Sequence, residues 1–481
     1  MLPRMPARAA LLAFALAGCA VTPSTELPAG PGSSCEGKCD GDAASVRTQR
    51  DNLLANLLAQ MDSPAFLFGQ QRFNLTGVNP DGTQWLATEG MLDRSDAKAV
   101  TGHDPVVMGF DAWDLAIKPE SWAPSSKVHA EAAKVVHATG GIVVLDWHMR
   151  GCAADTFNAA GNEACLCKLA NDDAFARSWL LDGNYKKLAD ALERYQLDQI
   201  PIVFRPMHEH TGNWFWWGKP FWDCARSVPH PRFTGPAAFQ RVFRTIITYL
   251  RVERGLENLL VAYAPAGADS LATDDGYLEG YPGDEYVDIL GIDLYYQRDP
   301  SFPTQTVAFR RQLETVARLA RQRGKVAALT EVGNTQLAND TTPAQSRWFS
   351  DQLLQLTDGV GLAYALTWEN RTKGYEQFWV PYGDHPGVAD FRAFEASDRT
   401  LFLDDAPELG QPPEHGYPVC GSCTSDPDGD RWGWEHERSC RVASWCLAPS
   451  APICKRCASD PDGDGWGWED ARSCVKLASC T

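Results

Sequence analysis

Between residues 51 and 405, short runs rich in β-branched and aromatic residues alternate with segments of helical periodicity. The strand-like runs are eight, at residues 66–69, 106–111, 142–147, 200–204, 259–264, 287–294, 326–330 and 361–367. Between them, Phe239, Val242, Phe243 and Ile246 share one helical face, after Pro236 in a first-turn position. Eight alternating units predict an α/β fold, a closed (β/α)8 TIM barrel with long loops. An open doubly wound sheet is the alternative, although no glycine-rich phosphate loop follows the first strand.

The N-terminal residues have the pattern of an export signal. Arg4 and Arg8 precede a short apolar run, and Leu-Ala-Gly-Cys19 resembles the lipobox of bacterial lipoproteins. We therefore predict a lipoprotein signal peptide over residues 1–18, with lipidation at Cys19; an ordinary secretory signal is the alternative. Residues 19–50, rich in Pro, Gly and Ser, are predicted to be a flexible tether. These features predict an exported protein anchored by lipid to the bacterial cell surface or outer membrane.

Fifteen cysteines in an exported chain indicate disulfides. Eight of them form a tandem repeat in which each cysteine recurs 34 residues later. The repeats span residues 420–446 and 454–480, after a linker at 406–419. Such small modules need staples, so we predict two disulfides in each, with the pairing open. Another four cysteines, expected to brace loops by disulfides, follow the third and fourth strands: Cys152, Cys165, Cys167 and Cys224.

Polar residues collect where the predicted strands end, which in a barrel is the active-site face. Glu209 follows the fourth strand and Glu331 the seventh. A lone glutamate at a strand end is commonly a salt-bridge partner, but paired carboxylates across a barrel mouth are the equipment of glycoside hydrolysis. The net charge of −18 argues against nucleic acid, while aromatic residues beside Glu209 suit a sugar polymer.

Two other kinds of hydrolase are disfavoured. His208 and His210 flank Glu209 but lack a well-spaced third ligand, so we predict no metal centre. The sequence contains no Gly-x-Ser-x-Gly motif, the nucleophile elbow of many Ser/His/Asp hydrolases, so that class is disfavoured.

The segment Arg205-Pro-Met-His208-Glu209, followed by Gly-Asn-Trp214-Phe-Trp-Trp217-Gly, resembles the acid/base signature of glycoside hydrolase family 26, best known for β-mannanases. The resemblance continues around Asp293, Glu331 and Trp368 and covers residues 51–405. It implies a retaining mechanism, with Glu209 as general acid/base and Glu331 as nucleophile. It also implies substrate-binding roles for His148, Arg205, His208, Trp214, Trp217, Asp293, Tyr295 and Trp368. We further expect the apolar wall of Trp214, Phe215 and Trp216 to raise the pKa of Glu209, and Arg205 to reach Glu331.

The tandem repeats, with Trp-Gly-Trp-Glu in a cysteine frame, resemble family 10 carbohydrate-binding modules. The stacking candidates are Trp432 and Trp434 in the first repeat and Trp466 and Trp468 in the second; residues two apart share a face of a strand. The alternative is calcium binding, because Asp460, Asp462 and Asp464 match the opening of an EF-hand loop. Otherwise no cofactor is expected.

Together, these sequence features and resemblances predict a lipid-anchored, endo-acting, retaining β-1,4-mannanase that acts on plant-wall polysaccharide. Its modules would bind cellulose or another insoluble polysaccharide. A mixed-linkage β-glucanase, a β-1,3-xylanase and a non-catalytic polysaccharide-binding lipoprotein remain alternatives.

Overall fold

The computed structural model describes residues 39–118, 123–297, 301–343, 345–374, 376–406 and 409, together with four short strands between residues 432 and 475. The predicted signal peptide, Cys19 and the tether before residue 39 lie outside the described residues. Among the described helices, none combines the length and the apolar character needed to cross a membrane.

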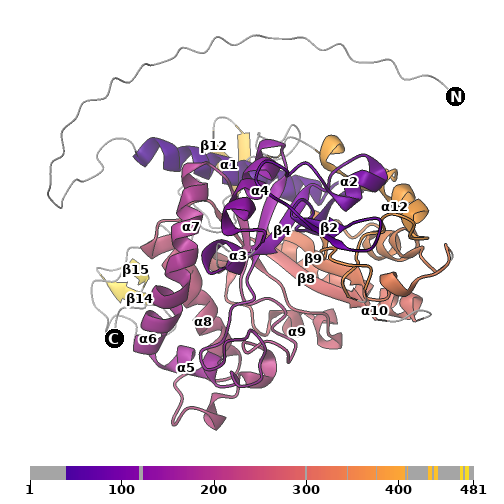
Figure 1. Ribbon diagram of the computed structural model, residues 1–481. Coiled ribbons are helices and arrows are strands. Elements are labelled where there is room, and N and C mark those ends of the chain that lie inside the picture. Colours follow the sequence, from indigo (N-terminus) through magenta and orange to yellow (C-terminus); the bar gives the residue numbers. More distant parts are fainter. Residues whose placement is uncertain are drawn as a thin grey trace. The chain divides into compact units, whose positions relative to one another are not determined.

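Eight parallel strands close into a barrel (Figure 1). Each strand pairs with the next along the chain, and β10 pairs with β1, which closes the ring. Closure confirms the barrel and excludes the open sheet. The strands are β1 (Phe66–Gln71), β4 (Val107–Asp111), β5 (Ile142–Asp146), β6 (Ile202–Arg205), β7 (Leu259–Tyr263), β8 (Ile289–Tyr296), β9 (Val326–Asn334) and β10 (Tyr364–Thr367).

Helices surround this barrel, and the longer ones bury an apolar face. In the helix that follows β6, the predicted apolar face is buried, and Pro236 begins the helix as expected. The helix before β9 ends at Gly324, which caps it in the left-handed conformation. The helices are α1 (Cys39–Gln60), α2 (Asp96–Thr101), α3 (Ala112–Ala116), α4 (Ser126–Ala138), α5 (Cys165–Asn171), α6 (Asp173–Phe175), α7 (Lys186–Leu197), α8 (Pro236–Thr248), α9 (Asp274–Leu278), α10 (Phe302–Arg323), α11 (Leu354–Thr357) and α12 (Val388–Glu395).

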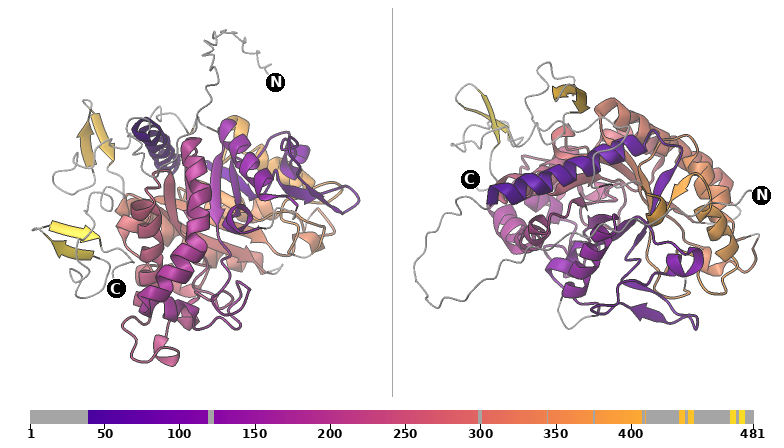
Figure 2. Two further views of the ribbon diagram at one scale, coloured as in Figure 1. Left: turned by 60° about the vertical axis from the view of Figure 1, so that its left-hand side comes forward. Right: turned by 90° about the horizontal axis from the view of Figure 1, so that it is seen from above.

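The helix α1 corrects the predicted tether, because its first twelve residues, 39–50, were expected to be irregular (Figure 2). Val46, Leu53 and Leu57 are buried, so the helix is fixed by packing rather than by its own sequence. Arg47 and Arg50 on the same helix form ion pairs with Glu257, which lies just before β7. The barrel domain therefore begins before residue 51.

Several short strands were not expected from the sequence. β2 (Thr76–Val78) and β3 (Gln84–Leu86) form a hairpin, and β11 (Thr400–Leu401) pairs with β1 outside the ring.

The C-terminal repeats each contain one two-stranded hairpin. β12 (Trp432–Glu435) pairs with β13 (Arg438–Arg441), and β14 (Trp466–Glu469) pairs with β15 (Arg472–Val475). The register is the same in both copies: the first tryptophan lies opposite the last residue of the partner strand. The two tryptophans of each copy thus stand two positions apart on one strand.

Candidate active site

A cavity of about 690 Å³ opens among residues that follow or end the barrel strands. Eight of the ten predicted catalytic and substrate-binding residues of the barrel line it: His148, His208, Glu209, Trp214, Asp293, Tyr295, Glu331 and Trp368. Carboxyl ends of parallel strands meet on one face of a barrel, which explains how residues so distant in sequence converge.

Glu331 lies within β9 and is almost fully buried. Its Oε1 accepts a hydrogen bond from the Arg205 guanidinium, and its Oε2 accepts one from the Tyr295 hydroxyl at 2.5 Å. The ladder between β8 and β9 shifts register just before Glu331, beside Thr330, whose hydroxyl donates to Asp293 at 2.6 Å. Such a bulge re-aims the side chain that follows it. Glu331 is thus held by two donors while it faces the cavity.

Arg205 differs from its predicted role as a substrate contact. Its side chain is fully buried beneath the cavity and does not line it. Besides Glu331, its guanidinium binds Asp293 at 2.6 Å and Asp146 at 3.2 Å. A planar guanidinium offers five donors in a fixed fork, so one arginine can orient three carboxylates. Arg205 therefore positions the site, and it reaches Glu331 as predicted.

Glu209 lies on the turn that follows β6, where the backbone is strained. Met207 and Glu209 have φ of 48° and 54°, in the left-handed region that residues other than glycine seldom adopt. The Glu209 amide donates to the Ala264 carbonyl at 2.7 Å, and Oε2 accepts from the Trp214 indole at 2.7 Å. Burial, and next the charge of Glu331, raise the pKa of Glu209 to about 7. This carboxyl can hold a proton near neutral pH.

The two glutamates face each other across the cavity. Oxygen atoms of Glu209, Asp293 and Glu331 all lie within 4.8 Å of one another. Burial raises the pKa of Asp293 well above its ordinary value. The arrangement therefore places the carboxyl groups of Glu209 and Glu331 around one small space.

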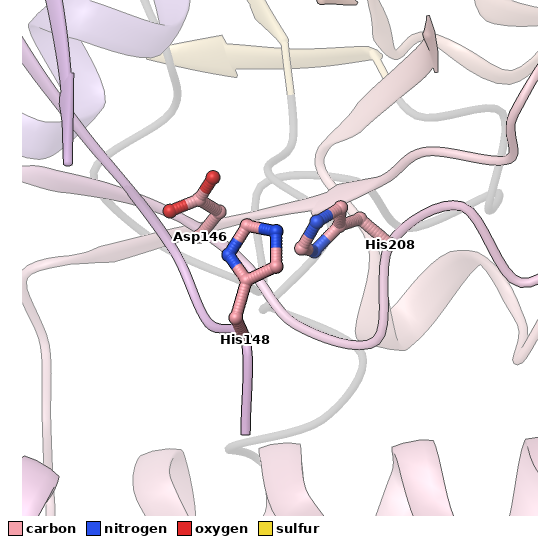
Figure 3. Close-up of side chains that lie close together, drawn as sticks. All are labelled: Asp146, His148 and His208. Atoms are coloured by element: carbon pink, nitrogen blue, oxygen red, sulfur yellow. The ribbon is translucent and has the colours of Figure 1, made fainter. Parts of the chain in front are cut away.

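The rings of His148 and His208 meet edge to face beside Asp146 (Figure 3), with ring centroids 4.8 Å apart. Burial lowers the pKa of His148, but the hydrogen bond and charge of Asp111 outweigh it and raise that pKa to about 9. Burial, aided by the nearby Arg205 charge, lowers the pKa of His208 well below its ordinary value. At neutral pH these shifts favour a protonated His148 and a neutral His208.

A nitrogen or oxygen from each of Asp146, His148 and His208 lies within 4.8 Å of the others, close enough to consider a metal ion. Each of the first two already has protein partners. Asp146 accepts from Arg205 and Gln71, and the Nδ1 of His148 meets Asp111 at 2.9 Å. The alternating pair His208 and His210 does not converge, because His210 meets the Tyr263 hydroxyl at 3.0 Å instead.

Comparison with known proteins decides the family. The sequence profile described as Glycosyl hydrolase family 26 matches residues 43–348, more than half of the chain. The chain belongs to glycosyl hydrolase family 26.

Named relatives of this family 26 chain are only partly covered by it. It is 30% identical over 407 residues to a mannan endo-1,4-beta-mannosidase of Bifidobacterium adolescentis, covering 77% of this chain and 37% of that protein. It is 26% identical to a mannan endo-1,4-beta-mannosidase of Bacillus subtilis, covering 44% of this chain and 56% of the relative. The solved structure of a modular endo-β-1,4-mannanase from Cellulomonas fimi is similar with a TM-score of 0.63 and 26% identity, over 76% of this chain and 77% of that one.

Trp217 also differs from its predicted role in the family 26 site. It is fully buried and does not line the cavity, and its indole donates to the His208 carbonyl at 2.7 Å. Its ring stacks on Phe215 at 4.6 Å, behind the cavity wall. Of the four aromatic residues 214–217, only Trp214 is exposed to solvent, with 43% of its surface accessible.

Sequence reasoning missed several residues of the family 26 cavity: Ala266, Gly267, Gln297, Phe309, Thr335, Glu376 and Trp379. Trp379 packs edge-on against Tyr295, and its ring lies where a Cβ on Gly333 would be, only 2.5 Å away. The side-chain oxygen of Asn370 accepts the Trp379 amide at 2.7 Å. Gly333 and Asn370 both lie in segments that carry the resemblance to family 26. These two residues were therefore the signal in the sequence from which the position of Trp379 could have been predicted.

The four loop cysteines of the family 26 domain form two disulfides, Cys152–Cys165 and Cys167–Cys224. The predicted bracing is confirmed, and the pairing that the sequence left open is now defined. Both bridges lie in segments that follow β5 and β6, next to the Glu209 turn.

Proposed function

We propose that the protein is an endo-acting, retaining β-1,4-mannanase, with Glu209 as acid/base and Glu331 as nucleophile. The observation that carries the proposal is the approach of the two carboxylates, whose oxygens lie within 4.8 Å. Retaining glycosidases hold their carboxyl groups about 5–5.5 Å apart, whereas inverting ones need roughly 6.5–9.5 Å to admit water.

The first step is a displacement at the anomeric carbon. Glu331 attacks that carbon while Glu209 gives its proton to the glycosidic oxygen, so the C–O bond breaks and the leaving chain departs as an alcohol. In the second step Glu209, now a carboxylate, takes a proton from water, whose oxygen attacks the same carbon and frees Glu331.

The residues around the two glutamates suit these steps. Arg205 and Tyr295 hold Glu331 ready to attack. The raised pKa of Glu209, about 7, keeps its proton available in the first step. His148, His208, Trp214 and Trp368 provide polar and aromatic surface for a sugar ring.

Mannan is the proposed substrate because both of the curated relatives described above are named mannan endo-1,4-beta-mannosidases. The test is release of reducing sugar by the full chain from mannan, glucomannan, galactomannan, lichenan and β-1,3-xylan. We expect cleavage of the mannans. Cleavage of lichenan or β-1,3-xylan alone would replace the proposed substrate, and no cleavage by folded protein would favour the non-catalytic alternative.

Stereochemistry and mutation test the mechanism. Proton NMR during hydrolysis should show the β-anomer first; the α-anomer would contradict retention. Glu331→Ala should remove turnover, and normal activity in that variant would refute the nucleophile assignment.

We further propose that the two C-terminal repeats bind insoluble plant-wall polysaccharide such as cellulose and that Cys19 carries a lipid anchor. The register of the two hairpins supports this proposal: Trp432 and Trp434, and likewise Trp466 and Trp468, stand two positions apart on one strand, and residues at that spacing are expected on the same face. Two linked platforms gain avidity when both reach the surface.

The double variant Trp466→Ala/Trp468→Ala should weaken pull-down by cellulose or insoluble mannan and leave hydrolysis of soluble substrate nearly unchanged. Unaltered pull-down would refute the platform. If the repeats bind calcium instead, EDTA would alter their folding, and isothermal titration with calcium would show heat.

A further inference from the structure

The segment between β5 and α5, residues 147–164, lies against the Glu209 turn at three points. The Ala159 amide donates to the Trp214 carbonyl at 2.7 Å, and Asn158 forms a β-bridge with Phe215. The Trp216 indole donates to the Met149 carbonyl at 2.8 Å. The segment thus holds the aromatic strip that follows the acid/base.

One buried side chain organises this segment. Asn162, 1% exposed, accepts at its side-chain oxygen from the amides of Ala153 and Ala154, at 3.0 and 2.8 Å. Its side-chain nitrogen donates to the carbonyls of Ala154, Thr156 and Asn158, at 3.1, 3.1 and 3.3 Å. These five hydrogen bonds fix a stretch that has neither a helix nor a ladder of its own.

Two neighbours lock Asn162 in place. Gly151 lies so close that a Cβ there would come within 2.1 Å of the Asn162 side chain. The disulfide Cys152–Cys165 closes the segment around it. We call residues 149–165 the brace.

The brace reaches the reacting atoms through Trp214. The Trp214 indole donates to Oε2 of Glu209 and packs over Gly212, where a Cβ would come within 2.4 Å of the ring. With the Trp214 carbonyl bound to Ala159, the position of the indole depends on the brace.

We propose that Asn162, with the Cys152–Cys165 disulfide, positions Trp214 and through it the carboxyl of Glu209 for proton transfer to the leaving group. The inference rests on the proposed glycosidase function and adds positioning residues to it. Asn162 does not line the cavity and is not a catalytic residue.

The test compares substrates that differ in their need for the proton. The leaving group of mannan is a sugar hydroxyl, which would depart as an unstable alkoxide without a proton from the acid. The leaving group of a 2,4-dinitrophenyl β-mannobioside is a stable phenolate, which needs little acid assistance. In Asn162→Ala we expect kcat/KM on mannan to fall roughly tenfold or more, part of the 10²–10⁴-fold that general acid catalysis supplies. On the dinitrophenyl substrate, kcat/KM should stay within about twofold, because the first step there does not depend on the acid.

A pH profile gives a second readout. The Trp214 hydrogen bond lowers the pKa of Glu209, so losing it should move the alkaline limb of kcat/KM on mannan to higher pH. The variants Gly151→Ala and Cys152→Ser/Cys165→Ser should repeat both effects, and either decides the question if Asn162→Ala does not fold.

Asn258→Ala is the matched control. Asn258 is also a fully buried asparagine whose amide donates to backbone carbonyls, but it precedes β7 at the opposite end of the barrel. It should lose stability without changing the ratio of the two substrates. Equal loss on both substrates in folded brace variants, or no loss on either, would overturn the proposal. Wild-type protein that cleaves neither substrate would instead refute the proposed function.

Discussion

At Glu209, the proposed acid/base residue, the influences on the pKa of the carboxyl oppose each other. Burial and the charge of Glu331 raise the pKa of Glu209, while the charge of Arg205 and then the hydrogen bond from Trp214 lower it, with about 7 as the result. The sequence predicted the rise from the aromatic wall, and burial confirms its direction. It could not predict that the nearest member of that wall donates a hydrogen bond to the carboxyl, because this depends on the backbone turn.

The first step of the proposed glycoside cleavage requires protonated Glu209. The value of kcat/KM should therefore fall as pH rises through about 7. In Trp214→Phe the lowering hydrogen bond is gone, and the alkaline limb should move to higher pH. The measurement is kcat/KM on a soluble mannan across pH 5–9, in the range where the pH optimum of a tuned glutamate is expected. A limb at unchanged pH in the variant would refute the coupling.

Glu331, the proposed nucleophile, accepts its second hydrogen bond from Tyr295. Tyr295→Phe should lower kcat/KM on mannan roughly 10- to 100-fold, since a hydrogen bond to a charged group contributes about 1.5–3 kcal/mol. Tyr296→Phe is the control: that hydroxyl meets Thr306 at 2.9 Å and lies outside the cavity. Comparable losses in both variants would mean that Tyr295 acts through folding.

At the scale of elements, α1 was hidden from sequence reading. Its composition continues the polar and small residues of the tether, and only the buried positions on the folded barrel identify the helix. The eight strands were predictable, because buried parallel strands read as continuous apolar runs. The lengths of β8 and β9 were not predictable. Each strand continues into polar residues, such as Tyr295 in β8 and Asn334 in β9, because these residues pair with the neighbouring strand.

Packing of α1 can be tested by shortening one side chain. Leu57 is fully buried, so Leu57→Ala should lower the free energy of unfolding by about 2–5 kcal/mol. Leu197, 69% exposed at the end of α7, is the matched control and should change stability by less than about 0.5 kcal/mol. Denaturant unfolding measures both. A small effect at Leu57 would mean that α1 is not part of the cooperative unit.

The two disulfides should differ in their stabilising effect. Cys167–Cys224 joins residues 57 apart, whereas Cys152–Cys165 joins residues 13 apart. Loop-closure entropy predicts about 4 kcal/mol for the longer loop and about 3 kcal/mol for the shorter. Paired Cys→Ser variants compared by denaturant unfolding test this order, and a larger loss from the shorter loop would contradict it.

At the scale of the whole molecule, buried titrating groups make stability depend on pH. The pKa of His148 is raised to about 9, so its contribution is complete below its ordinary value of 6.5 and is lost as pH rises through 9. Stability should therefore decline between pH 6.5 and 9. His148→Gln should flatten that decline in thermal unfolding; an equally steep decline in the variant would assign it to other groups.

The part of the site that short sequence motifs contribute was predictable. Glu209, Glu331 and six neighbours converge as expected, but Arg205 and Trp217 belong to the supports beneath the wall. A sequence motif marks both contact and support residues, and only burial separates them. Trp379 and Glu376 were missed because loops from outside the motifs complete the cavity.

A hydrogen bond at the far end of the barrel has a practical consequence. The Asn56 side chain on α1 donates to the Leu409 carbonyl at 2.9 Å, so the first helix of the catalytic domain meets its last described residue. Domains whose ends lie together tolerate circular permutation and insertion into host loops. Leu409 meets α1 at Asn56, but the helix extends 17 residues further back to Cys39, about 25 Å at 1.5 Å per residue. A cassette of this barrel grafted into another protein would therefore need a short joint after Leu409 and a longer one before Cys39.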